Sequence, residues 1–551
     1  MLEAGALIAP AFSFEAALQC CTCPAEVAAA TDLFAYCLQH SPRAKSFGWE
    51  IGMKFIRGLL AVSALLVVSC SLLAQSADLA LKSHRAKELL EAGKAEEAIP
   101  IYRELVRALP NNPGLRMNLG LALNMAGHKR EAVREFEKVL KLDPQHVPAL
   151  LFLGTGYVEL GEPAKAVDPL TKVLKAQPDS LDAQEVLGEA LLSLDRLEEA
   201  AETFRRLAQR DTGNPRVWYG LGLSYQRLAQ RNFEELEKVA LGSAYWLELV
   251  AVSRFKLTQY FSAFYFYRQA LSQMPTMRGV HAGLAEVYRK TNHPDWAAIE
   301  EERERALAPP DCSVEKLECD FQGGRYLELV ALSEGVRTPE SYYWRTRTYN
   351  QLALEAFTRL GQLPPSAEMH ELIAKMESSR RQYVESAREW REALKLSPGN
   401  PSLQEGLAVA LYQSGDLEGA RAMFEDLLQR QPESAELNYM LGDTFLNSQK
   451  PQEAVPHLEK AVTLMPGLLA AHGSLARAYL ALGEAEKAVP HLKAALPIDE
   501  DGSLHYQLGR AYQAHGEPAL AREMLKKYQE IHRVQEAENK AVEKEVEMTP
   551  P

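Results

Sequence analysis

A spacing of thirty-four residues recurs along this chain and constrains its fold more than any other feature. Gly120, Gly154 and Gly188 lie one such period apart, and an alanine follows each of them after twelve residues. A fixed period of this length is typical of stacked helix pairs, in which each pair buries its apolar face only against its neighbours. The repeat predicts an all-α fold, an α-solenoid of stacked antiparallel helix pairs.

Small residues recur at two phases of the period, and both phases predict close contact between helices. Alanine marks the twentieth position of most units, where it lets the second helix approach the first, while larger residues around it fill the interface. Glycine or alanine occupies the eighth position of ten units: Gly120, Gly154, Gly188, Gly222, Ala251, Ala285, Ala408, Gly442, Ala476 and Gly509.

One unit carries a more specific pattern, which consists of Trp218, Leu221-Gly222 and Tyr225. This spacing resembles that of the tetratricopeptide repeat (TPR) family, and the resemblance extends from residue 79 to about residue 535. It implies a superhelix of helix pairs that acts as a non-catalytic scaffold for protein or peptide segments. The chain is similar in this respect to exported bacterial TPR scaffold proteins.

Two irregular modules interrupt the array. YNQLALEAFTRL (349–360) parallels YQRLAQRNFEEL (225–236), which indicates a duplication larger than one repeat. After residue 226 the sequence predicts a shortened unit in place of an ordinary second helix. The expected organisation is an N-terminal array at 79–311 with an irregular module at 216–275, a degenerate helical pair at 312–340, a C-terminal array at 341–535 with a related module at 342–398, and a charged tail at 536–551.

Residues 53–77 have the layout of a secretory signal: Lys54 and Arg57 precede an apolar stretch over 58–68, and small residues follow. Three outcomes stay open, in this order: cleavage before Ala77, lipidation of Cys70 within a lipobox-like sequence, and retention as a single membrane anchor. Each predicts repeats outside the cytoplasm, in the periplasm or elsewhere in the cell envelope, with membrane contact only through this segment. Met53 is a natural start, so residues 1–52 are interpreted as an upstream extension without native structure.

Charge and cysteine content exclude several classes of protein. The net charge of −13, with no balancing basic stripe, argues against a nucleic-acid partner. Seven cysteines in 551 residues argue against a fold defined by a disulfide framework. Cys312 and Cys319 would lie about 10 Å apart along a single helix, too far for a bridge, unless Cys312 precedes the helix. Cys319 is expected instead to be a small packing residue.

The sequence contains none of the common phosphate-binding, nucleophile-elbow or zinc-protease motifs. His457 and His491 occupy equivalent places in adjacent repeats, but two histidines do not complete a metal site. We therefore expect no enzyme activity, no cofactor and no metal.

The TPR resemblance also implies where a partner would bind. In that family, positions 2, 5, 9, 12 and 13 of the first helices face the concave groove. Positions 5 and 9 include the candidate partner-binding residues Tyr219, Glu248, Tyr439, Asp443, Arg477, Tyr506 and Arg510.

The mixed surface at 439–510 is the better candidate for a polar peptide, although these side chains could equally be ordinary solvated groove residues. Met117, Leu121, Leu151 and Thr155 stand where a carboxylate clamp for peptide C-termini needs lysine and asparagine, so such a clamp is not expected. The alternative function is that of a membrane-tethered accessory subunit of an envelope enzyme or of a secretion or assembly complex.

Overall fold

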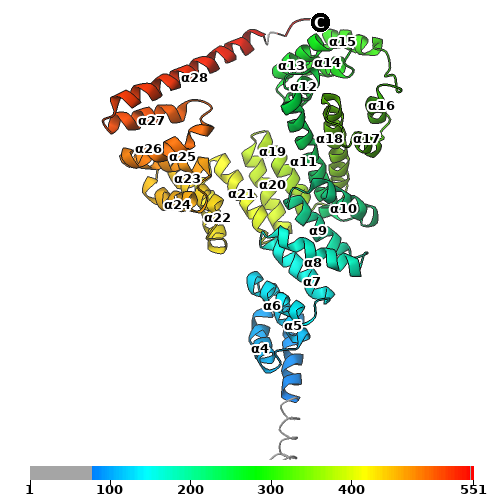
Figure 1. The fold of residues 1–551 in the computed structure, drawn as a ribbon, viewed down its shortest axis with the longest axis vertical. Coiled ribbons are helices and arrows are strands. Elements are labelled where there is room, and N and C mark those ends of the chain that lie inside the picture. Colours follow the sequence, from blue (N-terminus) through cyan, green and yellow to red (C-terminus); the bar gives the residue numbers. More distant parts are fainter. Residues whose placement is uncertain (1–76, 546–547) are drawn as a thin grey trace, which may run out of the picture. The chain divides into compact units, whose positions relative to one another are not determined.

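The computed structural model describes residues 77–545 and 548–551, and every regular element within these ranges is a helix. Successive helices form antiparallel pairs (Figure 1), which confirms the predicted all-α solenoid. The interpretations placed on residues 1–52, on the signal segment before Ala77 and on Cys70 concern residues outside the described ranges.

Pro178 ends the first of two compact units, and Asp179 begins the second. This division falls within the stretch expected to form one N-terminal array, 79–311. The first unit contains a helix over 77–91 followed by α4 (Ala95–Ala108), α5 (Pro113–Met125), α6 (Lys129–Leu142), α7 (Val147–Glu159) and α8 (Pro163–Ala176).

The second unit begins with regular pairs, passes through two long helices, and ends in regular pairs again. Its first part contains α9 (Leu181–Ser193), α10 (Leu197–Arg210), α11 (Pro215–Ala240), α12 (Ala244–Lys256), α13 (Tyr260–Gln273), α14 (Val280–Lys290), α15 (Pro294–Ala306), α16 (Lys316–Gln322) and α17 (Tyr326–Leu332). Its second part contains α18 (Pro339–Gly361), α19 (Ala367–Ser379), α20 (Tyr383–Leu396), α21 (Pro401–Ser414), α22 (Leu417–Arg430), α23 (Ala435–Asn447), α24 (Pro451–Leu464), α25 (Leu469–Ala481), α26 (Ala485–Ala495), the short 3-10 helix η3 (Leu496–Ile498), α27 (Ser503–Ala514) and α28 (Pro518–Glu545).

Glycine at the eighth position explains how the two helices of a pair approach each other. Gly188 on α9 faces Phe204 on α10, and Gly442 on α23 faces Leu458 on α24. A Cβ atom would lie 2.8 Å from the Phe204 ring in the first case and 2.6 Å from Leu458 in the second. Because carbon atoms cannot pack at these distances, any larger residue would push the pair apart.

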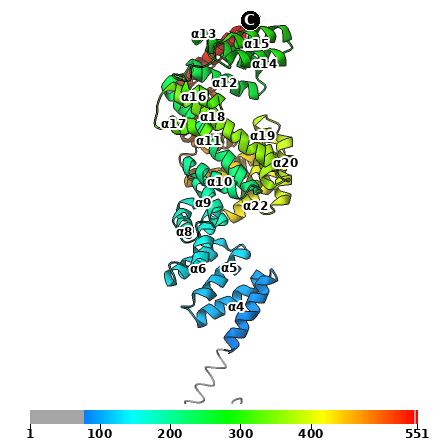
Figure 2. The same cartoon turned by 90° about the vertical axis from the view of Figure 1, so that its right-hand side faces the viewer.

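The expectation of a shortened unit after residue 226 is wrong, because α11 continues without a break to Ala240. Residues 226–240 contain neither glycine nor proline, so nothing in the sequence stops the helix before Leu241-Gly242. α18 is also long, and the two helices lie side by side (Figures 1 and 2). Tyr225 and Tyr349 stack between them with ring centroids 6.1 Å apart.

Each long helix is followed by a helix pair of matching size. α12 and α13 contain 13 and 14 residues, and α19 and α20 also contain 13 and 14 residues. A duplicated module of one long helix and one pair would produce this arrangement. The α11–α18 contact then joins the two copies within the second unit.

Cys312 and Cys319 are joined by a disulfide, with their Cα atoms 5.6 Å apart. The expectation that Cys319 is only a packing residue is therefore wrong. The bridge forms because Cys312 lies in the turn before α16, which begins at Lys316, so the two cysteines do not share one helix. α16 and α17 lie on either side of Gly323-Gly324.

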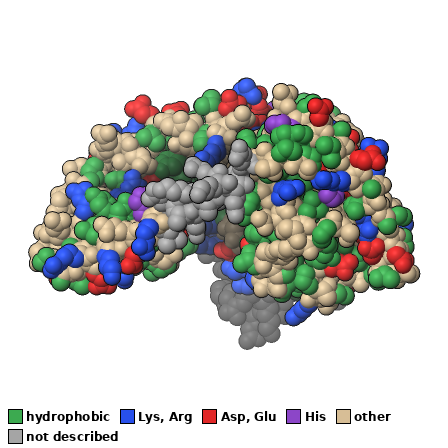
Figure 3. All heavy atoms as spheres, turned by 90° about the horizontal axis from the view of Figure 1, so that it is seen from above, with side chains coloured by type: hydrophobic (Ala, Val, Ile, Leu, Met, Phe, Trp, Pro, Cys, Tyr) green, Lys and Arg blue, Asp and Glu red, His purple; other side chains and the backbone are tan. Residues whose placement is uncertain are grey.

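Charges of both signs are interspersed over the face of the molecule shown in Figure 3. Among the helices of residues 77–545, none is long and apolar enough to cross a membrane.

Candidate protein-binding face

The first helices of the last four regular pairs, α21, α23, α25 and α27, carry most of the predicted partner-binding residues. We call their shared surface the first-helix face and define it by Tyr412, Tyr439, Asp443, Asn447, Ser474, Arg477, Tyr506 and Arg510. Side-chain caps begin two of these helices, α21 at Asn400 and α23 at Ser434. The Ser434 side chain, for example, accepts a hydrogen bond from the Leu437 N–H at 3.2 Å and starts α23.

Asp443 is the centre of a polar network that joins three consecutive first helices. Its carboxylate accepts hydrogen bonds from the hydroxyl of Tyr412 on α21, from the hydroxyl of Ser474 on α25 at 2.6 Å, and from the Asn447 amide at 3.0 Å. Asp443 is 5% exposed, so these donors replace the water that a carboxylate would otherwise bind. The network fixes the register of three repeats on this face.

Arg477 lies at the edge of this network and reaches solvent. Its guanidinium forms an ion pair with Asp443 at 3.6 Å and donates a hydrogen bond to the Asn447 side-chain oxygen at 3.2 Å. The Arg477 side chain is 45% exposed, whereas that of Asp443 is 8% exposed. A guanidinium has five N–H donors, so contacts with Asp443 and Asn447 leave donors free for a partner.

Two tyrosines on this face stay protonated at neutral pH. Burial raises the pKa of the Tyr412 phenol, and its hydrogen bond to Asp443 raises it further. Burial also raises the pKa of Tyr439, and the nearby Asp443 carboxylate adds to the effect. Both phenols therefore keep their protons, and that of Tyr412 donates a hydrogen bond to Asp443.

Tyr506 and Arg510 lie on α27, and both are exposed. The Tyr506 ring packs against Tyr528 of α28 with centroids 5.3 Å apart, which leaves 42% of the residue accessible. These two residues extend the first-helix face by one repeat.

Tyr219, a predicted binding residue, is buried between α11, α18 and α19. Its hydroxyl donates to the Glu371 carboxylate at 2.8 Å and accepts from the Lys375 ammonium at 2.8 Å. Burial and the Glu371 charge raise its pKa well above the usual range. The residue is 8% exposed and holds helices together.

Glu248 is also buried and presents no open surface to a partner, because it is 3% exposed. Burial raises its pKa, and the positive charge of Arg347 opposes that rise. Glu248 is buried because α18 lies against α12. α18 brings Tyr343 and Arg347 over the position that a regular repeat would leave open.

Sequence reasoning missed Tyr412, Asn447 and Ser474. Tyr412 is at position 12 and Asn447 at position 13 of their repeats, which are inward-facing positions in the family pattern, so an inspection of all five positions would have found them. Ser474 is at position 6 and has no such signal. It is recognisable only from its contact with Asp443.

The histidines form no metal site within the described residues, where no cluster of three or more potential ligands occurs. His457 lies with its Nδ1 3.5 Å from the Asn438 side-chain oxygen, and His491 contacts His472 with 2.8 Å between their Nδ1 atoms. The closeness of two ring nitrogens requires one of them to donate a hydrogen bond, so the contact couples α26 to α25.

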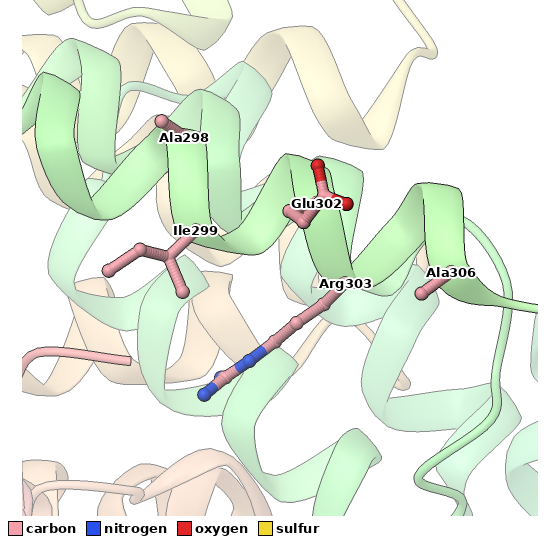
Figure 4. Close-up of a pocket in the computed structure, with 5 residues that line it drawn as sticks. All are labelled: Ala298, Ile299, Glu302, Arg303 and Ala306. Carbon is pink, nitrogen blue, oxygen red and sulfur yellow. The ribbon is translucent and has the colours of Figure 1, made fainter.

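The outer surface of α15 has an open depression lined by Ala298, Ile299, Glu302, Arg303 and Ala306 (Figure 4). Ile299 and Arg303 extend to one side of the helix, and Glu302 points away from them. A single helix lines this depression, so it lacks the converging groups of a small-molecule site.

Family models described as tetratricopeptide repeat match residues 89–153, 151–215, 372–435, 405–468, 445–504 and 502–527, which together cover just over half of the chain. The chain belongs to the tetratricopeptide repeat family. TPR proteins are generally non-catalytic scaffolds, in keeping with the first-helix face described above. The matches leave out residues 216–371, where the long helices and the short pair α16–α17 depart from the TPR pattern.

Solved TPR structures resemble parts of the chain. MamA from Desulfovibrio magneticus RS-1 is 25% identical, covers 31% of this chain and 96% of its own, and has a TM-score of 0.29. A TPR protein from Parabacteroides merdae ATCC 43184 is 14% identical over 60% of this chain and 98% of its own, with a TM-score of 0.31. Yeast Tom70 is 12% identical over 86% of this chain and 95% of its own, with a TM-score of 0.29. No curated protein sequence matches the chain.

Proposed function

We propose that the chain is a non-catalytic scaffold that binds an extended protein or peptide segment on the first-helix face. The observation that carries this proposal is the state of Arg477, which Asp443 and Asn447 hold in place while its guanidinium stays half exposed. A cation positioned in advance loses little conformational entropy when a partner binds. An ordinary solvated groove residue would have no neighbouring side chains that hold it in one position.

The chemistry of the face favours a segment with acidic side chains. Arg477 and Arg510 lie at position 9 of consecutive repeats, and exposed Tyr506 lies about one helical turn before Arg510 on α27. Arginine binds carboxylates through paired N–H donors, and tyrosine adds apolar contact area and a hydrogen-bond donor. Because exposed ion pairs contribute about 0–1 kcal/mol each, affinity would come from several repeats acting together.

We further propose that the scaffold works outside the cytoplasm, in the bacterial envelope. The signal-like residues 53–77 support this location, as does the Cys312–Cys319 disulfide, because such bridges persist in oxidising compartments. The second candidate function is that of a membrane-tethered accessory subunit of an envelope complex. It rests on the same segment, but it requires that the chain stays attached to the membrane through that segment. Mass spectrometry of the mature N-terminus and fractionation distinguish a cleaved, a lipidated and an anchored chain.

A displayed library of random peptides, selected on the full chain, tests the binding function. We expect enrichment of peptides rich in Asp and Glu, and we expect Arg477→Glu with Arg510→Glu to weaken their binding about tenfold or more. The matched control is Arg391→Glu with Lys526→Glu, which changes charge equally on the second helices α20 and α28. Selected peptides that bind both variants as tightly as wild type would overturn the proposal.

A further inference from the structure

Met548 and Thr549 contact the C-terminal part of α14 and the turn that follows it, far from them in the sequence. The Tyr288 hydroxyl donates a hydrogen bond to the Thr549 carbonyl at 2.8 Å, and the Thr291 hydroxyl lies 3.5 Å from the Met548 sulfur. Figures 1 and 2 both show the C-terminus beside α14 and α15. The Thr291 hydroxyl also lies 2.9 Å from the Val287 carbonyl, so the end of the chain is placed by one hydrogen bond, from Tyr288, and by the packing of Met548.

The surface beneath Met548 is apolar and aromatic. Met548 packs against the buried cluster that includes Tyr288, Phe264 and Tyr267, and the Trp296 ring lies 5.6 Å from Tyr288 in an edge-on arrangement. An unbranched thioether adapts to an irregular aromatic surface and gains favourable sulfur–ring contacts. The surface beneath Met548 is therefore apolar and aromatic, as a methionine side chain requires.

The terminal sequence Met548-Thr549-Pro550-Pro551 is already restricted to an extended conformation before it docks. Proline fixes its own φ and keeps the residue before it out of the helical region, so Thr549 and both prolines favour a polyproline-type chain. Such a chain leaves its carbonyls free to accept hydrogen bonds, and aromatic side chains with a hydroxyl donor recognise it in other proteins. Tyr288 provides that hydroxyl here, and burial raises its pKa so that it remains a donor.

We propose that Tyr288, Thr291 and the aromatic cluster beneath them form a docking site for a Met-Thr-Pro-Pro segment, and that the chain's own C-terminus occupies it. Because α28 tethers the segment, docking is intramolecular and benefits from a high local concentration. A partner that carries a similar segment must displace the C-terminus before it can bind. The site is separate from the first-helix face, so either proposal can fail alone.

Fluorescence polarisation with a labelled peptide of residues 543–551 tests the site on the full chain. In the wild type the tethered C-terminus competes with the peptide, whereas Met548→Asp places a charge against the apolar surface and frees the site. We expect the peptide to bind Met548→Asp about tenfold more tightly than wild type. Equal binding to the two proteins, or no binding to either, would overturn the proposal.

A second pair of variants distinguishes specific docking from a general effect on folding. Tyr288→Phe, introduced into Met548→Asp, removes only the hydroxyl and should weaken peptide binding about three- to tenfold. Tyr267→Phe is the matched control, because this tyrosine belongs to the same buried cluster, whereas the hydrogen bond to Thr549 comes from Tyr288. Equal effects of the two substitutions would contradict the assigned role of Tyr288.

Light scattering determines whether the segment binds its own chain. We expect wild type and Met548→Asp to have the same molar mass, since docking within one chain does not join two copies. A wild-type dimer that Met548→Asp converts to a monomer would place the segment on a second copy and contradict docking within one chain.

Discussion

The Asp443 carboxylate accepts a hydrogen bond from the Ser474 hydroxyl at 2.6 Å, across the junction between two repeats. Both residues are almost fully buried, at 5% and 6% exposure. Asp443 also accepts from Tyr412 in the preceding repeat, so one carboxylate joins three consecutive first helices. The same carboxylate pairs with Arg477, which connects the stability of the array to its proposed binding surface.

Asp443→Ala should destabilise the C-terminal repeats, because it leaves the Tyr412, Asn447 and Ser474 donors without their acceptor. We expect a loss of about 1–3 kcal/mol in the free energy of unfolding, which comes mainly from the buried Ser474 hydroxyl, because Tyr412 is only partly buried and Asn447 is exposed. Hydrogen exchange of α21, α23 and α25 and urea unfolding measure it. Asp426→Ala is the control, since Asp426 is 46% exposed and pairs with Arg430 on the same helix. Equal stability of the two variants would show that the network contributes nothing.

Gly442→Ala should separate α23 from α24, because the added Cβ would lie 2.6 Å from Leu458. Overpacking of this kind costs about 1–3 kcal/mol. Gly467→Ala is the matched change in a turn where no atom lies within 4 Å of an added Cβ. Thermal unfolding should show a lower midpoint for Gly442→Ala only. Equal midpoints would mean that the pair tolerates a wider separation than the structure shows.

Stability should fall as pH falls from about 7.5 to about 5.5, in part through two histidines. Burial lowers the pKa of His457 and of His491, and the neighbouring His472 lowers that of His491 further. The unfolded chain, with histidine pKa values near about 6.5, therefore binds more protons than the folded chain in this range, so acid favours unfolding. Urea unfolding of wild type and of His457→Gln with His491→Gln at both pH values should give a shallower dependence for the variant. An identical dependence would exclude these histidines as the cause.

Reduction of the Cys312–Cys319 bridge should loosen the segment around α16 and α17. The chain-entropy model gives about 2–3 kcal/mol for a loop of this size. Hydrogen exchange of residues 312–332 with and without reductant measures the change, and peptide mapping under non-reducing conditions checks the pairing. The variant Cys312→Ser with Cys319→Ser should show the same hydrogen exchange as the reduced chain. Reductant should not change the exchange of this variant. Unchanged exchange on reduction would show that the bridge does not restrain this segment.

The regular repeats could be predicted from the sequence because their signal is local and periodic. Gly188 and Gly442 mark the close contacts of their pairs, and the structure places a large side chain against each of them. α11 was mispredicted because the repeat pattern implied a break that the helix-forming residues after 226 do not provide. At this point the helix-forming residues determine the structure, and the 34-residue period does not.

The candidate site was only partly predictable, because helices that are distant in the sequence cover some of its expected positions. Asp443 and Arg477 follow the inward-facing positions of regular repeats, and the structure brings them together. Tyr219 and Glu248 occupy equivalent positions but are covered, because α18 and α19 pack over them. No period in the sequence shows that a helix more than 90 residues later in the chain will fill a groove position. The Cys312–Cys319 bridge was misjudged for a related reason, since it depends on where α16 begins.

Site-specific photo-cross-linking tests the central claim most directly. A benzoylphenylalanine in place of Tyr506 puts the probe on the first-helix face, and one in place of Val384, which is 66% exposed on the second helix α20, is the control. With an acidic peptide selected on the full chain, we predict cross-links from position 506, their loss with Arg477→Glu and Arg510→Glu, and none from position 384. Cross-links from position 384 alone, or from position 506 undiminished by the charge reversal, would contradict the account.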